Sequence, residues 1–554
     1  MVIGASSWGY EVVSRVRDPW NMDTTRRRFL AGGAAAAVLF AGTTAAGSAR
    51  FRAPRLLGDP FTLGVASGDP TPDGVVLWTR LVPDPGAPDG SGGMNHEAVT
   101  VDYEVAHDEQ FRRVVRRGSV VADRALGHSV HPEVGGLEPA RWYFYRFRAG
   151  SAISPVGRTR TAPAPWHPSR RLRFAFASCQ AWNDGHYTAY DHMAREDLDL
   201  VVHLGDYLYE YPIARGRRGT AVEPGLRHEP RDLGGYRMHY AWYKSDPALR
   251  RAHAAFPWLV TMDDHELADD WAGDAAGQSV DRDIVAPVFR ARRAAAFQAM
   301  YEHQPLRLAQ LPSGPRIRLH RRYRFGELAE ITMLDTRQFR RGDSILGAPQ
   351  REWLVDGFAN SSARWQILGN QVVLGRTDHD AGPGAVLSGD AWDGYPAERA
   401  AVLAAAARSA RNLVVITGDR HENYAADLRA DPADPRTPVV AAEFTGTSIT
   451  SGGDGIDIGG RGIDLLAANP DLKFFNAQRG YARVEVDEQL WRTDFRVLPY
   501  VSRPGAPIST RASYVVEDAV PGVRPARDHR PVAAGAARRV APGAPGGENQ
   551  GDVR

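Results

Sequence analysis

Five short apolar runs that each end in polar residues are the feature that most restricts the fold of this chain. The runs span residues 172–178, 198–204, 258–262, 331–334 and 413–417. They have the length of buried strands, and helical patterns at 288–303 and 396–407 lie between them. Buried strands that alternate with helices predict an α/β layered sandwich domain, in which ligands collect at the strand ends.

Ionisable side chains are concentrated directly after these runs. Two runs are followed by Gly205-Asp206 and Gly418-Asp419, where a glycine permits a sharp turn that projects the carboxylate from the sheet edge. A third run is followed by Asp263-Asp264-His265-Glu266. Four such groups are costly at the end of a buried strand unless a cation or partner charges compensate them. The pattern therefore favours a metal site over a solvent-facing charge run.

A thiol, a phenol, carboxylates and imidazoles together suggest a metal site. Cys179 is the only cysteine, so it has no disulfide partner within the chain and is either a buried apolar residue or a ligand. Tyr209 follows Asp206 by three residues, and a phenolate oxygen suits ferric iron better than zinc. Tyr207 and Tyr211 are expected to be packing residues. In the cluster Gly418-Asp419-Arg420-His421, Asp419 and His421 share one side of an extended backbone. Arg420 then points either towards phosphate or into a surface salt bridge.

The region before these runs has a different pattern. From about residue 61 to 160, short alternating apolar runs are separated by Gly, Pro and Asp, which is typical of an all-β immunoglobulin-like or fibronectin-like sandwich. The proline-rich stretch 161–168 predicts a linker. We therefore expect a β-sandwich domain at 50–165, a catalytic domain at 166–523 and a disordered tail at 524–554, which is rich in Pro, Gly, Ala and Arg.

The N-terminal segment 1–49 predicts export. Arg26-Arg27-Arg28 precede a weakly apolar Ala/Gly stretch at 31–46, the pattern of a cleavable twin-arginine signal peptide. The stretch is short and poorly apolar for a stable transmembrane span. Met22 stands just before the arginines, so residues 1–21 are a candidate extension upstream of the true start. The twin-arginine machinery carries folded proteins, which suits an enzyme that loads its metal before export.

The overall charge argues against nucleic acid as a partner. The chain has 68 Lys and Arg against 66 Asp and Glu, a formal net charge of +2. Such a balance lacks the global basic excess that draws proteins onto nucleic acid through counterion release. No nucleic-acid-binding module is expected.

Together these residues resemble the PhoD-type alkaline phosphatases, within the wider metallophosphoesterase group. The resemblance runs from the block at 61–70 to about Tyr514 and includes the blocks at 334–338, 350–354, 392–396, 443–448 and 479–481. It implies a ferric ion (Fe3+) with calcium ions (Ca2+) nearby. The implied iron ligands are Cys179, Asp206, Tyr209 and His421.

The same resemblance assigns further residues. Asp206 and Asp419 would reach calcium, and His265 would face the phosphate. Asp264, which occupies a position where relatives often have Asn, is also expected to be a metal ligand. Relatives usually have an Asn-Asn pair where this chain has Asp269-Asp270. A carboxylate binds calcium at least as well as an amide, so Asp270 is expected to be a metal ligand, although it adds negative charge near a dianionic substrate. Asp471 stands where a histidine is expected.

The function implied is hydrolysis of exported phosphate mono- and diesters to inorganic phosphate. A metal-bound oxide or hydroxide would attack phosphorus, with Arg420 and His265 assisting charge neutralisation and departure of the leaving group. Two alternatives stay open from the sequence. One is a phospholipase D-like or teichoic-acid phosphodiesterase, and the other is a non-catalytic calcium-binding surface protein, which the soft Cys179 ligand disfavours.

Overall fold

The computed structural model describes residues 56, 58–213, 218–277 and 284–527. The predicted signal peptide lies outside these residues, as do positions 528–554 of the predicted tail. The last strand, β23 (Val520–Pro525), includes Arg524 and Pro525, which the sequence prediction had assigned to the tail. Among the described residues, no helix is long and apolar enough to cross a membrane.

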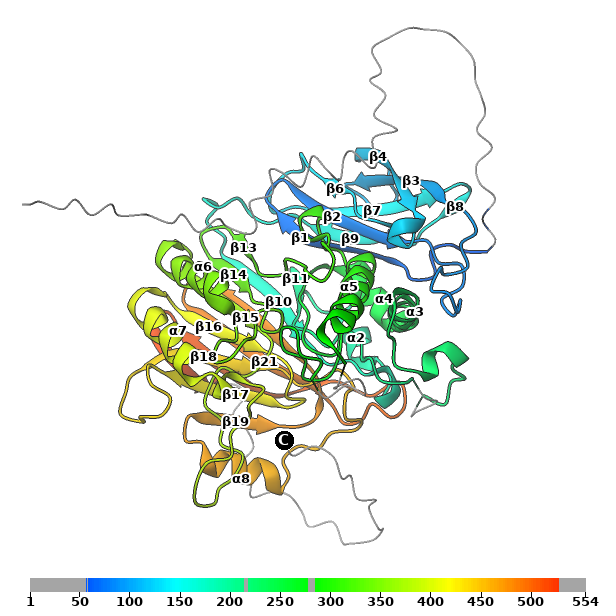
Figure 1. The fold of residues 1–554 in the computed structure, drawn as a ribbon. Helices are drawn as coiled ribbons and strands as arrows, with labels where there is room; N and C mark the ends of the chain where they lie inside the picture. The colour runs from blue at the N-terminus through cyan, green and yellow to red at the C-terminus, as the bar shows by residue number, and fades with distance from the viewer. Residues whose placement is uncertain (1–55, 57, 214–217, 278–283, 528–554) are drawn as a thin grey trace, which may run out of the picture. The chain divides into compact units, whose positions relative to one another are not determined.

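Two large sheets form the centre of the fold (Figure 1). The first contains parallel β10 (Arg171–Ala177), β11 (Leu200–His203) and β12 (Pro257–Val260), and β10 also pairs antiparallel with β20 (Arg479–Asp487). Beyond β20 lie β21 (Leu490–Leu498), β22 (Ser509–Glu517) and β23. The strand order is β23-β22-β21-β20-β10-β11-β12-β1-β2-β5, in which β1 spans Val65–Thr71, β2 spans Gly74–Arg80 and β5 spans Ser129–Val130.

The second sheet has the order β13-β14-β15-β16-β18-β17-β19. Its elements are β13 (Arg321–Phe325), β14 (Ala329–Met333), β15 (Trp365–Asn370), β16 (Leu413–Thr417), β17 (Asn423–Arg429), β18 (Val439–Thr445) and β19 (Leu472–Asn476). Strands β14, β15, β16 and β18 run parallel to one another. The two sheets pack face to face through a shared apolar core that includes Phe174, Val202, Ile331, Ile367 and Phe444.

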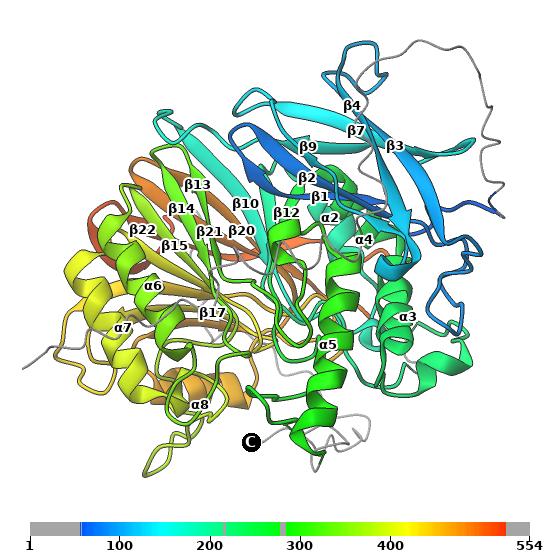
Figure 2. The same cartoon turned by 45° about the horizontal axis from the view of Figure 1, so that its top comes forward.

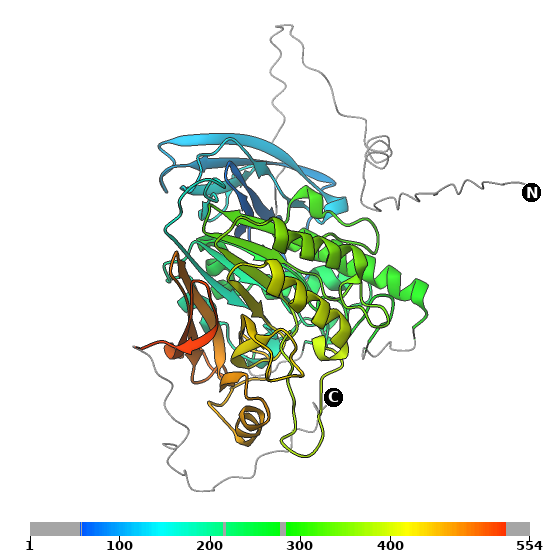
Figure 3. The ribbon, with the colours of Figure 1, turned by 90° about the vertical axis from the view of Figure 1, so that its left-hand side faces the viewer.

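Helices cover the outer face of each sheet (Figure 2). On the first sheet lie α2 (Thr188–Met193), α3 (Leu233–Lys244), α4 (Pro247–Ala255) and α5 (Ala286–His303). On the second lie α6 (Gly347–Asn360) and α7 (Pro396–Ser409), which Figure 3 shows side by side, while α8 (Gly460–Ala468) packs beside β19. Helices α5 and α7 confirm the helical patterns at 288–303 and 396–407.

The layers explain why the polar clusters meet. Each predicted apolar run contains a strand, β10, β11, β12, β14 or β16, that is almost wholly buried because it lies between two layers. Parallel strands end at a common edge, so the residues that follow β10, β11 and β12 in the chain come together in space. The same argument applies to β14 and β16 in the facing sheet.

The N-terminal β region, predicted as a sandwich domain at 50–165, shares a sheet with the catalytic region. Strand β1 (Val65–Thr71) pairs in parallel with β12, and β2 (Gly74–Arg80), β5 (Ser129–Val130) and β6 (Glu133–Val134) follow it. This pairing covers what would otherwise be an exposed sheet edge at β12. The likeness to immunoglobulin or fibronectin domains stays a prediction.

A smaller sheet packs against this extension. It contains β4 (Val114–Asp123), β3 (Ala98–Ala106), β7 (Trp142–Ala149), β8 (Ala152–Ile153) and β9 (Gly157–Arg160). Alternate residues of β7, among them Tyr145 and Phe147, are buried in one core with Val75 and Leu77 of β2. The period-2 pattern of these strands therefore reflects one face on the core and one face in solvent.

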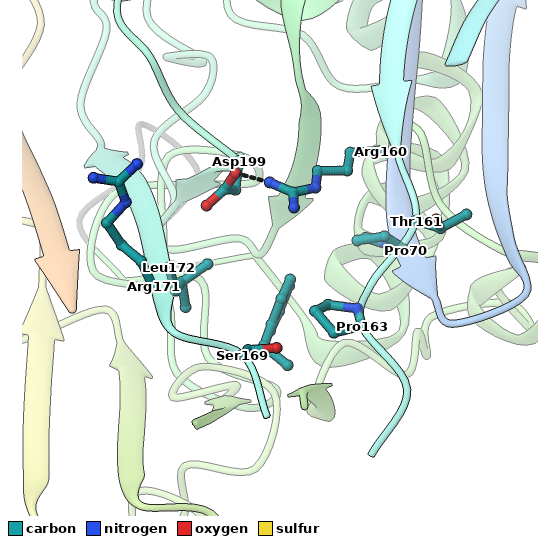
Figure 4. Close-up of a pocket in the computed structure, with 9 residues that line it drawn as sticks. Pro70, Arg160, Thr161, Pro163, Ser169, Arg171, Leu172 and Asp199 are labelled. Atoms are coloured by element: carbon teal, nitrogen blue, oxygen red, sulfur yellow. Dashed lines mark hydrogen bonds and ion pairs between the residues drawn. The ribbon is translucent and has the colours of Figure 1, made fainter. Parts of the chain in front are cut away.

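Ion pairs also tie the N-terminal region to the catalytic region. Arg160, at the end of β9, pairs with Asp199 just before β11, beside a small pocket that Figure 4 shows. The other Asp199 oxygen accepts a hydrogen bond from the Arg173 backbone N–H at 2.9 Å. Asp69 of β1 accepts a hydrogen bond from Arg321 Nη2 of β13 at 3.1 Å. The segment 161–168 therefore connects two regions that also touch directly.

A fully buried histidine makes the stability of this fold depend on pH. His203 ends β11, and neither ring nitrogen has a hydrogen-bond partner among the described residues. Burial lowers the pKa of His203 to about 3. The native state therefore binds fewer protons than the unfolded chain below the usual histidine pKa of about 6.5.

We expect this side chain to reduce the free energy of unfolding by about 1.4 kcal/mol for each pH unit below about 6.5, down to about pH 3. His203→Phe should remove that slope without a large loss of stability at pH 8, because no hydrogen bond is lost. Urea unfolding of parent and variant between pH 5 and 8 measures the difference. Equal slopes for the two proteins contradict the prediction, and the exposed His167→Phe is the control.

Candidate active site

Several residues at the edge formed by the strand ends adopt a backbone conformation that is unusual for side chains other than glycine. Eleven non-glycine residues in the described part of the chain have positive φ, and five of them are predicted metal ligands. Such conformations cost on the order of 1–3 kcal/mol each and cluster at functional sites. The five are Cys179 (φ 59°), Asp206 (54°), Asp270 (54°), Asp419 (65°) and His421 (56°).

Gly205 shows why the turn before Asp206 requires glycine. Its φ is 113°, and a Cβ atom placed there would lie 2.5 Å from the backbone nitrogen of Asp263. The loops after β11 and β12 therefore approach each other more closely than any side chain permits. This approach brings Asp206 next to the acidic segment that starts at Asp263.

The four predicted iron ligands come together. Cys179 Sγ lies 3.3 Å from Asp206 Oδ2, and Tyr209 Oη donates a hydrogen bond to the same oxygen at 3.2 Å. Tyr209 Oη is also 3.1 Å from His421 Nε2. One ligand atom from each of Cys179, Asp206 and His421 lies within 4.8 Å of the other two.

The chemistry of this set fits a bound cation. Asp206 is buried and its Oδ1 has no hydrogen-bond partner among the described residues. Burial, together with the charge of Asp206, raises the pKa of the Cys179 thiol well above its usual value. Burial likewise raises the pKa of Asp206, and Asp264 adds to the effect while His265 opposes it. A cation held by these atoms would compensate the buried charges and favour the thiolate and carboxylate forms.

A second group of carboxylates adjoins the first. Ligand atoms of Asp206, Asp264 and His265 lie within 4.8 Å of one another, and so do those of Asp264, Asp269 and Asp270. The Asp270 backbone N–H donates to Asp264 Oδ2 at 2.8 Å. The structure thus places two predicted metal ligands of this segment, Asp264 and Asp270, in one acidic group of the kind that oxygen-seeking cations prefer.

Asp419 and Arg420 follow β16 at the same edge. Burial raises the pKa of Asp419 to about 7, a shift that the neighbouring Arg420 opposes and Asp390 and Asp264 reinforce. Arg420 Nε is buried without a hydrogen-bond partner among the described residues. Asp471, by contrast, forms an ion pair with Arg429, Nε to Oδ2, at 2.7 Å.

His265 is held by a residue that the sequence analysis did not identify. Its Nδ1 lies 2.8 Å from Oε2 of Glu210, a fully buried carboxylate whose other oxygen accepts from the Asp269 backbone N–H at 2.7 Å. The His265 ring stacks on Tyr209 with centroids 4.0 Å apart. Burial alone lowers the pKa of His265, but Glu210, Asp264 and Asp206 raise it well above its usual value.

Glu266 and Arg337 are the other functional residues that sequence reasoning missed. Glu266 is buried and accepts hydrogen bonds from the backbone N–H groups of Asp206 (3.1 Å), Tyr207 (2.6 Å) and Asp263 (2.7 Å). It therefore fixes the loops after β11 and β12 to each other. The signal available in the sequence was that Glu266 belongs to an acidic run directly after a buried strand.

Arg337 supplies positive charge inside the acidic edge. It is 0% exposed and its Nε donates to Asp263 Oδ1 at 2.6 Å. Its other nitrogens reach Asp390 Oδ1 at 2.7 Å and Asp264 Oδ1 at 3.4 Å. Burial raises the pKa of Asp263 to about 8 although Arg337 opposes the shift. Its sequence signals were its place in the block 334–338 and its position three residues beyond the apolar run 331–334.

Comparison with known proteins identifies the family. Residues 174–495, more than half of the chain, match the family model described as PhoD-like phosphatase. The chain belongs to the PhoD-like phosphatase family. Residues 46–163 match the N-terminal domain of PhoD-like phosphatases, so the resemblance inferred from the motifs is confirmed along both regions.

Two relatives support this assignment. The chain is 44% identical over 525 residues to alkaline phosphatase D of Bacillus subtilis (strain 168), an alignment that covers 90% of this chain and 88% of the relative. A solved structure of PhoD is 45% identical, with a TM-score of 0.80 over 85% of this chain and 93% of that one. This PhoD-like phosphatase is therefore an enzyme of the phosphoric ester hydrolase class, as predicted.

Removing Arg337 should be strongly destabilising. Arg337→Met removes the counter-charge of the buried Asp263 and the half-buried Asp390, and breaking such a buried pair costs about 3–5 kcal/mol. Urea unfolding measures the loss. The matched control is Arg117→Ala, which removes an exposed pair with Glu104 and should cost less than about 1 kcal/mol. Similar losses for the two variants would show that Arg337 is not the central counter-charge.

Proposed function

We propose that this PhoD-like phosphatase is a metal-dependent alkaline phosphatase that hydrolyses phosphate mono- and diesters to inorganic phosphate. The observation that carries the proposal is the convergence of Cys179, Asp206, Tyr209 and His421, in which Asp206 contacts Cys179 and Tyr209, and Tyr209 contacts His421. A thiol, a carboxylate, a phenol and an imidazole around one point form a mixed soft and hard donor set. Membership of a phosphatase family disfavours the non-catalytic calcium-binding alternative.

The donor sets support iron and calcium as the cations. Cys179, Asp206, Tyr209 and His421 would hold Fe3+, because phenolate and thiolate both stabilise it. Asp206, Asp264, Asp270 and Asp419 would hold Ca2+, which prefers carboxylate oxygens. When bound, these cations would lower the pKa of a coordinated water and offset the negative charge of the phosphate.

Residues of the chain itself would complete the reaction. Glu210 binds Nδ1 of His265, so only Nε2 is left to give a proton to the departing oxygen of the substrate. Arg420, with its unpartnered Nε, would bind a phosphate oxygen through charge-assisted hydrogen bonds. Glu266 would hold Asp206 in place through the backbone of the loop.

Export belongs to the same proposal. Arg26-Arg27, followed by the weakly apolar stretch, support transport by the twin-arginine route to a secreted, cell-wall or periplasmic location. A route that carries folded protein is compatible with a site whose ligands come from loops between residues 179 and 421. Such a site exists only after the chain has folded.

Tyrosinate bound to ferric iron absorbs visible light, which gives a direct test of the ligand set. The purified protein should be coloured and contain about one iron per chain, and Tyr209→Phe should lose the colour. Cys179→Ala and Asp206→Ala should lose iron and activity. The control is Tyr211→Phe, two residues away and outside the set. Visible spectra measure the colour, and metal analysis measures the iron content. An Asp206→Ala variant with unchanged iron content and turnover would refute the assignment.

Loss of the proton donor should depend on the leaving group. His265→Asn is expected to lower kcat about 100-fold or more for an alkyl phosphate, whose alkoxide needs a proton, and much less for 4-nitrophenyl phosphate. Glu210→Gln should follow the same trend with a smaller effect, because it only orients the ring. Steady-state kinetics on both esters measure the ratio. An equal loss on both esters would exclude His265 as the donor.

A further inference from the structure

Tyr211 differs from the two other tyrosines of its segment in being exposed. Tyr207 is 0% exposed and Tyr209 is 6% exposed, whereas Tyr211 is 42% exposed. The prediction that Tyr211 is a packing residue is therefore wrong, because its ring lies at the surface beside the site. Its centroid is 5.1 Å from that of His265, and the two rings meet edge to face at 65°.

The surroundings of His265 fix where a leaving group must lie. Nδ1 is occupied by Glu210, and one ring face is covered by Tyr209. Nε2 lies 3.9 Å from Asp269 Oδ1, beyond hydrogen-bond distance. A substrate oxygen that accepts a proton from Nε2 must come within about 3 Å of it. Of the two tyrosine rings that border His265, Tyr209 is buried and Tyr211 is exposed, so the atoms bonded to that oxygen can reach Tyr211.

We propose that Tyr211 forms the leaving-group subsite and selects esters whose leaving group carries a neutral planar ring. The inference rests on the proposed function, in which His265 protonates the leaving oxygen. An aromatic leaving group can pack on the exposed face of Tyr211, whereas a small alkyl group gains little contact there. The side chain acts on specificity and takes no part in bond breaking.

Charge at the same place explains the preference for a neutral ring. Asp269, whose side chain is 28% exposed, and the buried Glu210 both stand beside His265. A leaving group with its own negative charge would be repelled by Asp269.

Phosphonates separate binding at this subsite from the reactivity of the leaving group. Phenylphosphonate and methylphosphonate carry the same charged group and differ only in what would contact Tyr211. We expect Tyr211→Ala in the metal-loaded enzyme to raise the inhibition constant of phenylphosphonate about 2- to 10-fold and to change that of methylphosphonate less than twofold. Tyr211→Phe should keep the parental ratio, because the ring face is retained.

Trp166→Ala is the matched control, since Trp166 is an aromatic residue 77% exposed and outside the site. It should leave both constants unchanged. An equal change for both phosphonates in Tyr211→Ala, or no change for either, would overturn the subsite. A parent enzyme that hydrolyses neither phenyl phosphate nor glycerol phosphate would instead contradict the proposed function, so the two failures are distinguishable.

Discussion

Compensation of buried negative charge is the constraint on which this structure depends. Asp206, Asp263, Asp264 and Glu266 are at most 4% exposed, and Arg337 is a fully buried cation that contacts two of them. Backbone N–H groups satisfy Glu266, but Asp206 Oδ1 and Asp263 Oδ2 have no partner among the described residues. Protonation or bound cations must offset the charge of such an edge, so the proposed metal binding would also stabilise the fold.

The scaffold reaches this arrangement through backbone strain at the strand ends. Five predicted metal ligands have positive φ, and the surrounding layers hold them there because the strands before them are buried on both faces. The covered edge of β12 adds to this rigidity, since β1 and the N-terminal sheet continue the catalytic sheet. The N-terminal region therefore supports the site from outside it.

Much of the architecture followed from local patterns, and the errors have a common physical origin. The buried strands, the helices α5 and α7 and the position of the polar clusters follow from periodicity and from glycine at the turns. Local patterns did not predict that the N-terminal region shares a sheet with the catalytic region, because the pairing of Ser67 with Pro257 joins residues far apart in the chain. The sequence analysis also did not predict the exposure of Tyr211, because the burial of a side chain depends on the residues that pack beside it after folding.

The sequence by itself determined the family, the donor types and the strand ends at which they lie, because each is written in short contiguous motifs. Only the tertiary structure decided which residues contact the site residues and shift their pKa values. Glu210 meets His265 across 55 positions, and Arg337 meets Asp263 across 74. No local pattern specifies such pairs, because they form when parallel strands bring distant loops to one edge of the sheet. The charges that shift the pKa values of the site residues are set by these contacts.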